Sequence, residues 1–292
     1  MAAPMIEDID IFLKTSTVCD STRNLYGHYL VVFTNWIEEN NLNPDCIKQI
    51  NVIDFLNLHP CWNYSTRHNV VAAIRQYFRW RYGDEHQVTR VRIRKVETPP
   101  QRTLSSAELL TLISSIDTTS PIGIRNKAII CLMADTGMRA SEVCSLEMKH
   151  LNIERRSCLV LGKGNRWLSK VFVPFTAEML GQWLAIRSSQ KNIKANTVFI
   201  SFGGKRPGTP ITRHGLHSLC ECLASKSGLE QFGPHAMRRT FATLAIENGA
   251  PTRLVQLAGG WKNLEMVERY TRALTPDAIR VYSPLDRLKT QQ

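Results

Sequence analysis

The amino-acid sequence predicts a mainly α-helical protein with two domains, the second of which carries a small antiparallel β-sheet. Apolar residues recur at helical spacing along most of the 292-residue chain. Residues 158–162 and 170–174 instead read as two short strands joined by a polar turn. A Pro99-Pro100 pair separates two regions of different charge, and a chain of this length fits two domains of about 100–200 residues each.

The N-terminal part is expected to consist of short helices. One helix begins near Ser21 or Thr22. A second helix covers residues 65–81, with Ser65 or Thr66 as its N-cap. The arginines that fall largely on the faces away from its apolar stripe are Arg67, Arg75, Arg79 and Arg81. This helix fits a surface that lies against DNA, and it fits equally well an amphipathic helix whose arginines confer solubility.

Residues 97–104 are interpreted as a linker between an N-terminal domain, residues 1–96, and a second domain, residues 105–292. Its two prolines cannot continue a helix and favour an extended path. Directly afterwards, Ser105 and Glu108 have the spacing of a capping box ahead of several leucines. A new helix, and with it a new domain, is therefore predicted to begin there.

The net charge of +12 comes entirely from the second part of the chain. Residues 1–98 hold 11 basic and 11 acidic residues, whereas residues 99–292 hold 26 basic and 14 acidic ones. A positive surface of this size favours a polyanionic partner such as nucleic acid. From charge alone, a solvated basic face without a partner is an equally good interpretation.

The sequence has no feature of a membrane or secreted protein. No stretch approaches the ~20 unbroken apolar residues that a membrane helix needs, and the N-terminus lacks a basic start and an apolar block. We therefore expect no membrane partner and a cytoplasmic, nucleoid-associated location. In that reducing compartment the eight scattered cysteines are expected to be buried thiols, with no disulfide and no structural metal.

Four short segments carry residues suited to phosphate chemistry, although each is ambiguous alone. In the first, Gly137 ends one helix and Arg139 starts the next, where Glu142 can hold its guanidinium. The second is Lys163 in the turn between the strands, where flanking glycines allow a close approach to a phosphate. The simpler interpretations are a surface Arg–Glu pair and a solvated lysine.

The other two segments lie in the C-terminal third. His235 and Arg238 are three residues apart, so on a helix they project together and combine a proton carrier with a phosphate ligand. Trp261 follows a glycine pair and can donate one N–H, and Tyr270 has a hydroxyl able to attack phosphorus. The simpler interpretations are a capping histidine, a surface arginine, a core tryptophan and a half-buried tyrosine.

The four segments carry more weight together than singly. In chain order they read Thr136-Gly-Met-Arg139-Ala-Ser-Glu142, Gly162-Lys163-Gly164, His235-Ala-Met-Arg238, and Gly260-Trp261 followed by Tyr270. Two arginines, a lysine and a histidine suit the charge of a transferring phosphoryl group. A tyrosine, with an ordinary pKa of ~10, needs such neighbours to ionise. In this order and spacing, residues ~105–275 resemble the tyrosine recombinase (phage integrase) family.

The resemblance implies a site-specific DNA recombinase with a helical, SAM-like core-binding domain and an α-rich catalytic domain. Tyr270 would attack the scissile phosphate, giving a 3′-phosphotyrosyl link and a free 5′-hydroxyl. Arg139 and Arg238 would hold the nonbridging oxygens. The remaining roles implied are general acid for Lys163, base for His235, hydrogen-bonding buttress for Trp261 and support of the first arginine for Glu142.

The resemblance also implies the partners. The substrate would be double-stranded DNA with a specific recombination site, clamped by the two domains, and the assembly would be a homotetramer on two such sites. No cofactor, ATP or metal is expected, because one phosphodiester is exchanged for another. The expected DNA-binding residues are Arg67, Arg75, Arg79 and Arg239. Residues 276–289 hold enough apolar side chains to dock on a neighbouring subunit or on their own domain.

The sequence departs from the commonest family pattern at three points. Trp261 stands where many members have histidine, Arg239 stands where histidine often follows the arginine, and the hairpin after Lys163 is slightly long before Pro174. Two other functions remain open at this stage. They are a type IB topoisomerase, which uses a similar residue set, and a DNA-binding regulator that has lost catalysis.

Overall fold

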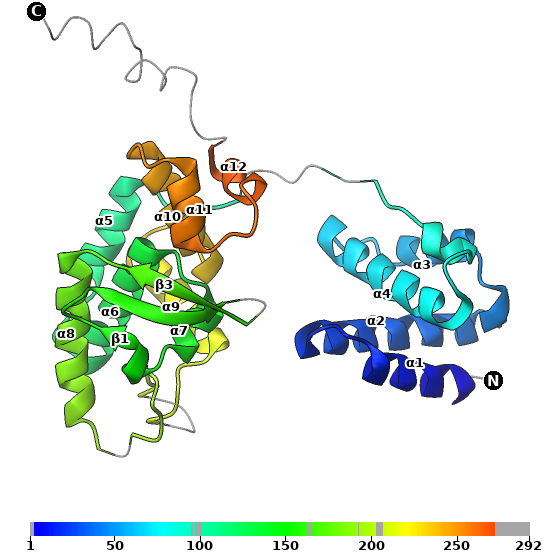
Figure 1. The fold of residues 1–292 in the computed structure, drawn as a ribbon, viewed down its shortest axis with the longest axis horizontal. Coiled ribbons are helices and arrows are strands. Elements are labelled where there is room, and N and C mark those ends of the chain that lie inside the picture. Colours follow the sequence, from blue (N-terminus) through cyan, green and yellow to red (C-terminus); the bar gives the residue numbers. More distant parts are fainter. Residues whose placement is uncertain are drawn as a thin grey trace, which may run out of the picture. The chain divides into compact units, whose positions relative to one another are not determined.

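The computed structural model describes residues 3–94, 96, 101–162, 165–191, 193–202 and 207–271. It confirms the mainly α-helical class with one small antiparallel sheet (Figure 1). The chain divides into two compact units, Met1–Pro99 and Pro100–Gln292. Within the described ranges, every helix is too short or too polar to cross a lipid bilayer.

The first unit is a helical bundle around an aromatic core. Its described elements are α1 (Ala3–Thr15), α2 (Asp20–Glu39), η1 (Pro44–Cys46), α3 (Gln49–Asn57), α4 (Tyr64–Tyr82) and η2 (Gln87–Arg90). Phe33 of α2, Phe55 of α3 and Phe78 of α4 are fully buried. The rings of Phe33 and Phe55 meet edge to face at 5.0 Å, a favourable aromatic geometry. This core joins three helices that are separated in the sequence.

The structure corrects the sequence prediction for this unit in two respects. The helices α1 and α3 were not predicted. The N-cap of α4 is Asn63, and neither Ser65 nor Thr66 has that role, because the Asn63 side chain accepts a hydrogen bond from the Thr66 N–H at 2.9 Å. Asparagine is among the best N-caps, and its position before Tyr64 starts the helix one residue earlier than predicted.

The second unit surrounds its small sheet with helices. The described elements are α5 (Ser106–Ser115), α6 (Pro121–Thr136), α7 (Ala140–Ser145), η3 (Met148–His150), β1 (Leu151–Asn152), β2 (Ser157–Gly162), β3 (Arg166–Val171), α8 (Pro174–Ser189), α9 (Arg213–Lys226), α10 (Pro234–Glu247), α11 (Thr252–Gly259) and α12 (Glu265–Thr271). The predicted capping box of Ser105 and Glu108 is present at the start of α5.

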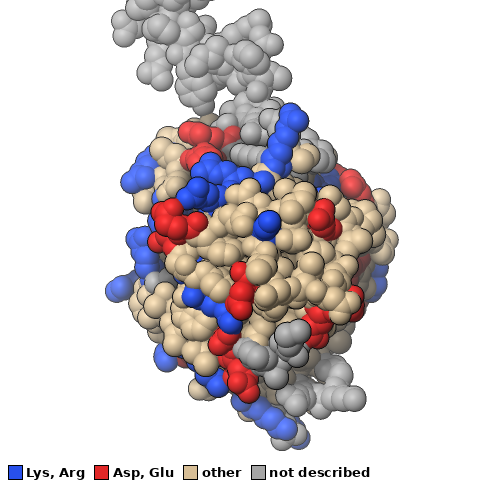
Figure 2. Space-filling view, turned by 90° about the vertical axis from the view of Figure 1, so that its right-hand side faces the viewer, with Lys and Arg blue, Asp and Glu red and all other residues tan. Residues whose placement is uncertain are grey.

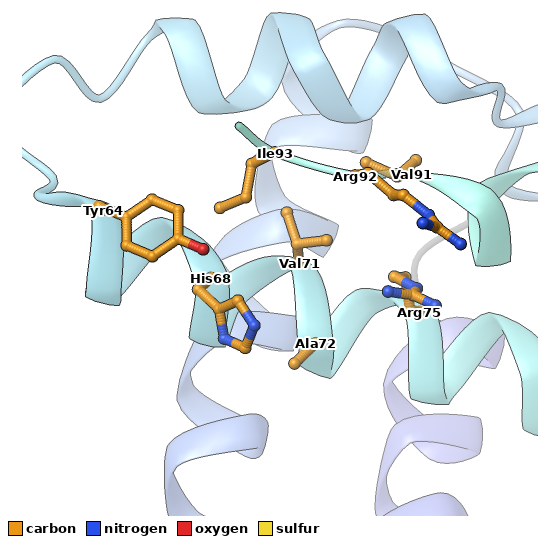
Figure 3. Close-up of a pocket in the computed structure, with 8 residues that line it drawn as sticks. All are labelled: Tyr64, His68, Val71, Ala72, Arg75, Val91, Arg92 and Ile93. Atoms are coloured by element: carbon orange, nitrogen blue, oxygen red, sulfur yellow. The ribbon is translucent and has the colours of Figure 1, made fainter. Parts of the chain in front are cut away.

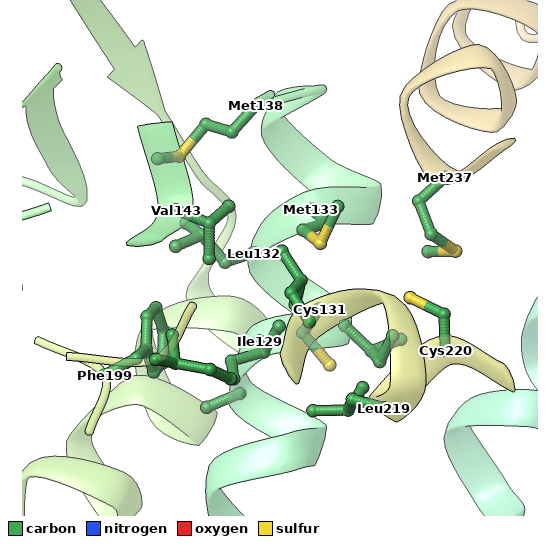
Figure 4. Close-up of a cluster of buried hydrophobic side chains, with 14 of the residues drawn as sticks. Ile129, Cys131, Leu132, Met133, Met138, Val143, Phe199, Leu219, Cys220 and Met237 are labelled. Atoms are coloured by element: carbon green, nitrogen blue, oxygen red, sulfur yellow. The ribbon is translucent and has the colours of Figure 1, made fainter. Parts of the chain in front are cut away.

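Helix α6 forms the centre of this unit. Ile129, Leu132 and Met133 are fully buried, and they pack among side chains from α7, α9 and α10 (Figure 4). A helix that is apolar on most of its faces belongs in a core. Because α10 packs along α6, the core places the start of α10 beside the end of α6 at Thr136. Four of the residues predicted to carry chemistry lie at or just beyond these two helix ends: Arg139, Glu142, His235 and Arg238.

The sheet has the order β1-β2-β3, and all its pairs are antiparallel. The predicted first strand is confirmed, but the second begins and ends earlier than the predicted 170–174. In the observed register Gly162 pairs with Arg166, and Pro174 already belongs to α8. This register pairs Lys170 with Cys158, and both side chains are buried.

The cysteines and the predicted linker also differ from expectation in part. Three cysteines are buried, but the prediction of buried thiols is wrong for four exposed ones: Cys19, Cys46, Cys61 and Cys222. Of the predicted linker, residues 97–100 lie outside the described residues. Leu104 is 1% exposed in the core of the second unit, and its N–H donates to the Thr240 hydroxyl at 2.8 Å.

Candidate active site

Arg139 stands at the junction of α6 and α7. Gly137 ends α6 in the left-handed conformation, at φ 59°, and Arg139 is the N-cap of α7. Its backbone N–H and its Nη1 donate to the two carboxylate oxygens of Glu142 at 2.8 and 2.7 Å. Glu142 is 1% exposed and Arg139 is half-buried, so this is not the surface pair of the simpler interpretation. The carboxylate therefore fixes both the backbone and the guanidinium of Arg139.

Arg238 approaches the same point from α10. It is 5% exposed, its Nη1 donates to the Gly137 carbonyl, and its guanidinium lies 4.0 Å from the centre of the Trp261 ring. Burial, and then the nearby Arg139, lowers its pKa to about 10, so it stays charged at neutral pH. Its Nη2 is buried without a hydrogen-bond partner. A buried N–H of this kind is costly unless an acceptor occupies the site.

The Trp261 ring covers this guanidinium, and Tyr270 lies beside the indole. A Cβ on Gly259 would lie 1.7 Å from the Trp261 ring, so the close approach of the indole requires glycine there. The ring stacks on Phe241 and lies 5.6 Å from the ring of Tyr270, which is half-buried on α12. Tyr270 also interacts electrostatically with Arg238. The contact of Trp261 with Arg238 is made by its ring face, whereas the sequence suggested a role for its N–H.

His235 lies in the first turn of α10, on the accessible side of the site. Partial burial, followed by the neighbouring Arg239, Arg238, Arg139 and His217, lowers the pKa of its imidazole below the ordinary value of 6.5. A histidine of this kind is neutral at neutral pH. It can therefore accept a proton from a hydroxyl that enters the site.

The structure does not describe Lys163, but it identifies a second lysine that sequence reasoning missed. Lys170 of β3 is 2% exposed, and its Nζ donates to the Thr136 carbonyl at 3.2 Å and to the Ala258 carbonyl at 2.5 Å. The feature of the sequence that could have found Lys170 is the alternation of side chains between the two faces of a strand, which places Lys170 on the core face opposite Cys158. Because the predicted strand began at Lys170, its inward direction could not be read from the sequence.

Three of the four arginines expected to bind DNA form hydrogen bonds or an ion pair within the protein. Arg67 donates from Nε to the Trp62 carbonyl at 3.1 Å, and Arg79 forms an ion pair with Asp84. Arg239 donates from Nε to the Arg102 carbonyl at 3.0 Å and from Nη1 to the side chain of Gln101 at 2.8 Å. The described contacts of Arg67, Arg79 and Arg239 are thus internal to the protein.

Arg75 differs from the other three. Its Nε is buried without a hydrogen-bond partner. The side chain lines a cavity of about 340 Å³ between α4 and residues 91–93, together with His68 and Arg92 (Figure 3). This cavity of the first unit combines cationic and aromatic side chains, a composition suited to a phosphate or a nucleic-acid backbone.

Positive and negative side chains are mixed on one face of the molecule. On the face drawn in Figure 2, basic and acidic side chains are interspersed among uncharged ones. The basic surplus of the sequence therefore does not gather on that face. Among the described residues, no group of three or more His, Cys, Asp and Glu side chains could hold a metal ion.

An α-rich unit in which two arginines, a histidine and a tyrosine lie within electrostatic range of one another is typical of tyrosine recombinases, enzymes that cut and rejoin DNA. The sequence comparison agrees with this class. Residues 102–275 match the model of the phage integrase family, and the chain belongs to that family. It is a tyrosine site-specific recombinase, and the comparisons give no support to a topoisomerase or an inactive regulator.

Relatives and solved structures extend this match over most of the chain. Tyrosine recombinase XerD of Listeria innocua is 26% identical over 268 residues, 89% of this chain and 88% of its own. Tyrosine recombinase XerC of Bacillus pumilus is 30% identical over 220 residues, 72% of this chain and 70% of its own.

Two solved structures share the fold. XerH bound to a palindromic difH substrate has a TM-score of 0.75 at 21% identity, covering 90% of this chain and 80% of its own. The Tn1549 transposon integrase bound to transposon right end DNA has a TM-score of 0.71 at 20% identity, covering 97% and 99%.

Proposed function

We propose that Tyr270 is the nucleophile of the strand transfer and that Arg139 and Arg238 bind the scissile phosphate. The observation that carries this proposal is the unpartnered Nη2 of Arg238, buried beside Trp261 and in electrostatic contact with Tyr270. A nonbridging phosphate oxygen is the acceptor that this N–H lacks. Glu142 and the Gly137 carbonyl hold the two guanidinium groups before any substrate binds, which is the preorganisation that electrostatic catalysis requires.

The proposed reaction transfers one ester bond and no net proton. His235, neutral at working pH, takes the proton of the Tyr270 hydroxyl as its oxygen attacks phosphorus. The bond to the 5′-oxygen breaks, and Lys163 donates a proton to that leaving oxygen. The products are a 3′-phosphotyrosyl ester and a 5′-hydroxyl. The 5′-hydroxyl of a second strand then attacks the ester, which restores a phosphodiester and releases Tyr270. Because the ester is conserved, the proposal needs neither ATP nor a metal ion.

The proposed partner is double-stranded DNA with a specific recombination site. The first unit, residues 1–96, would bind DNA with Arg75 and Arg92 of its cavity, and residues 105–292 would carry out the chemistry. XerH and the Tn1549 integrase are both DNA-bound in their solved structures, which supports this partner. We further propose a homotetramer on two sites, with residues 276–289 docking between or within subunits, and a cytoplasmic, nucleoid-associated location.

The test is to trap the covalent intermediate. Duplexes that the protein selects from a randomised library would be nicked near the cleavage position, so that the released strand diffuses away and the adduct accumulates. We expect the native protein to form the adduct. Tyr270→Phe should bind the same duplex within about threefold and form none, because only the nucleophile is removed.

The matched control is Tyr282→Phe, which alters the other tyrosine near the C-terminus. It should form the adduct, and peptide mapping should locate the DNA on Tyr270. An adduct formed by Tyr270→Phe, or one that maps to Tyr282, would refute the proposal.

A further inference from the structure

Three cationic side chains of the site donate hydrogen bonds to carbonyls at the C-terminal ends of two helices. At the end of α6, the Thr136 carbonyl accepts from Lys170 and the next carbonyl, that of Gly137, accepts from Arg238. At the end of α11, the Ala258 carbonyl accepts from Lys170 and the Gly260 carbonyl accepts from Arg139 at 3.4 Å. Helix C-termini carry partial negative charge and free carbonyls, so they suit cations.

Lys170 is the one member of this described set that binds both helix ends. The Gly137 carbonyl, which accepts from Arg238, lies one residue after the carbonyl of Thr136 that Lys170 binds. The Gly260 carbonyl, which accepts from Arg139, lies two residues after the carbonyl of Ala258 that Lys170 binds. If Lys170 released either end, the Gly137 and Gly260 carbonyls would move relative to each other. The two arginines that depend on those carbonyls would then lose their spacing.

We propose that Lys170 is a positioning residue for the strand transfer, which sets the separation of Arg139 and Arg238 by fastening the ends of α6 and α11 to β3. This inference rests on the proposed function of the two arginines. It assigns Lys170 no contact with DNA, because the side chain is 2% exposed and its Nζ donates to two backbone carbonyls.

The charge of Lys170 contributes to this role. Burial lowers its pKa to about 8, and the charged groups that face it are Glu142 from α7, which raises the pKa, and Arg238 and Arg139, which lower it. Cys158 on the paired strand β2 is the remaining titratable neighbour. Above pH 8 the neutral amine still donates, but it loses the charge-assisted part of both bonds. The separation should therefore become less well fixed as the pH rises through 8.

The first test compares Lys170→Met and Lys170→Arg with Lys149→Met, a control at a 68% exposed lysine of the same unit. Single-turnover cleavage is measured with a duplex whose scissile 5′-bridging oxygen is replaced by sulfur, because a thiolate leaves without a general acid. The contribution of Lys163 is then absent from every rate. We expect Lys170→Met to cleave about 100-fold more slowly with DNA affinity within about threefold, and Lys149→Met to match the native protein.

Rescue and pH dependence separate positioning from general destabilisation. Lys170→Arg keeps two donors and, because a guanidinium is far more basic than an amine, a charge that persists across the pH range of the assay, so it should recover most of the rate. The ratio of native to Lys170→Arg rates should fall as the pH rises from 7 to 9.5. This ratio also serves as the test if Lys170→Met does not fold.

A non-additive double mutant gives an independent readout. In an Arg139→Ala background, Lys170→Met should add little further loss, because one of the two groups that it positions is already gone. Native-like cleavage by Lys170→Met, additive losses, or a pH-independent rate ratio would each overturn the inference. If Tyr270→Phe forms no adduct while Lys170→Met cleaves normally, the proposed function stands and this inference alone fails.

Discussion

At the level of single residues, the site is built from cations that the fold holds in costly places. Lowering the pKa of Lys170 from 10.5 to about 8 corresponds to about 3 kcal/mol against its charged form. The unfolded chain keeps that proton up to pH 10.5, so this destabilisation is fully present below pH 8 and disappears as the pH rises from 8 to 10.5. A charge retained at such a cost is better explained by function than by stability.

Spacing in the sequence predicted one contact of the candidate site residues and missed others. The spacing of Arg139 and Glu142 predicted their contact, and the structure has it. Nothing in the spacing indicated that the Arg238 side chain would face the Trp261 ring, because their contact depends on the packing of α10 against the turn after α11. Lys170 was not predicted for the same reason, since its partners are backbone carbonyls in two distant segments.

At low pH, the dependence of the cleavage rate on pH should follow the titration of His235. Burial and the surrounding cations lower the pKa of its imidazole below 6.5, and only the neutral form can accept the tyrosine proton. The cleavage rate should therefore rise with pH through a midpoint below 6.5, and His235→Gln should cleave more slowly and lack that rise. His214→Gln, an exposed histidine on α9, should retain it. A midpoint above 6.5, or an unchanged rise in His235→Gln, would contradict the assignment of the base.

At the level of elements, local signals predicted starts and stops well where a side chain acts on its own backbone. The Ser105 capping box and the end of α6 at Gly137 are of this kind, and both are confirmed. The strand β3 was misplaced because its limits are set by pairing with β2, which the residues of β3 alone do not encode. The helices α1 and α3 are stabilised by burial against their neighbours, which their own residues do not encode.

The turn at Gly137 links the stability of the fold to the geometry of the site. Its φ of +59° disfavours any side chain, and a Cβ there would lie 2.4 Å from the ring of Phe241, which stacks on Trp261. Gly137→Ala should lower the free energy of unfolding by about 2–4 kcal/mol, combining left-handed strain with overpacking. It should also slow cleavage, because displacement of Phe241 moves the indole that covers Arg238. Denaturant unfolding and adduct formation measure the two effects.

Gly228→Ala provides the matched control for that substitution. Gly228 has a similar φ of +66°, lies in the same unit, and has nothing within 4 Å of the position of a Cβ. Its replacement should lower the free energy of unfolding by about 1–2 kcal/mol, the left-handed strain alone, and leave cleavage unchanged. Equal losses of stability in the two variants would show that the contact with Phe241 has no energetic consequence.

At the level of the whole molecule, each of the two units has a hydrophobic core of its own. The proline pair predicted that the chain divides near residue 100, because it interrupts helical periodicity in the sequence itself. Where the second core begins could not be read in the same way. Leu104 belongs to that core, and its backbone N–H donates to the hydroxyl of Thr240, which lies 136 residues further along the chain.

The second unit should therefore depend on residues that precede its first helix. In a fragment that begins at residue 105, the Thr240 hydroxyl loses its donor, Arg239 loses the Arg102 carbonyl and the Gln101 side chain, and the core loses Leu104. Burial of one leucine and three hydrogen bonds together stabilise by roughly 4–8 kcal/mol. A fragment of residues 101–292 should thus unfold at clearly higher denaturant concentration than a fragment of residues 105–292. Leu104→Ala in the longer fragment should lie between the two, and equal midpoints for the two fragments would show that residues 101–104 connect the units without supporting the site.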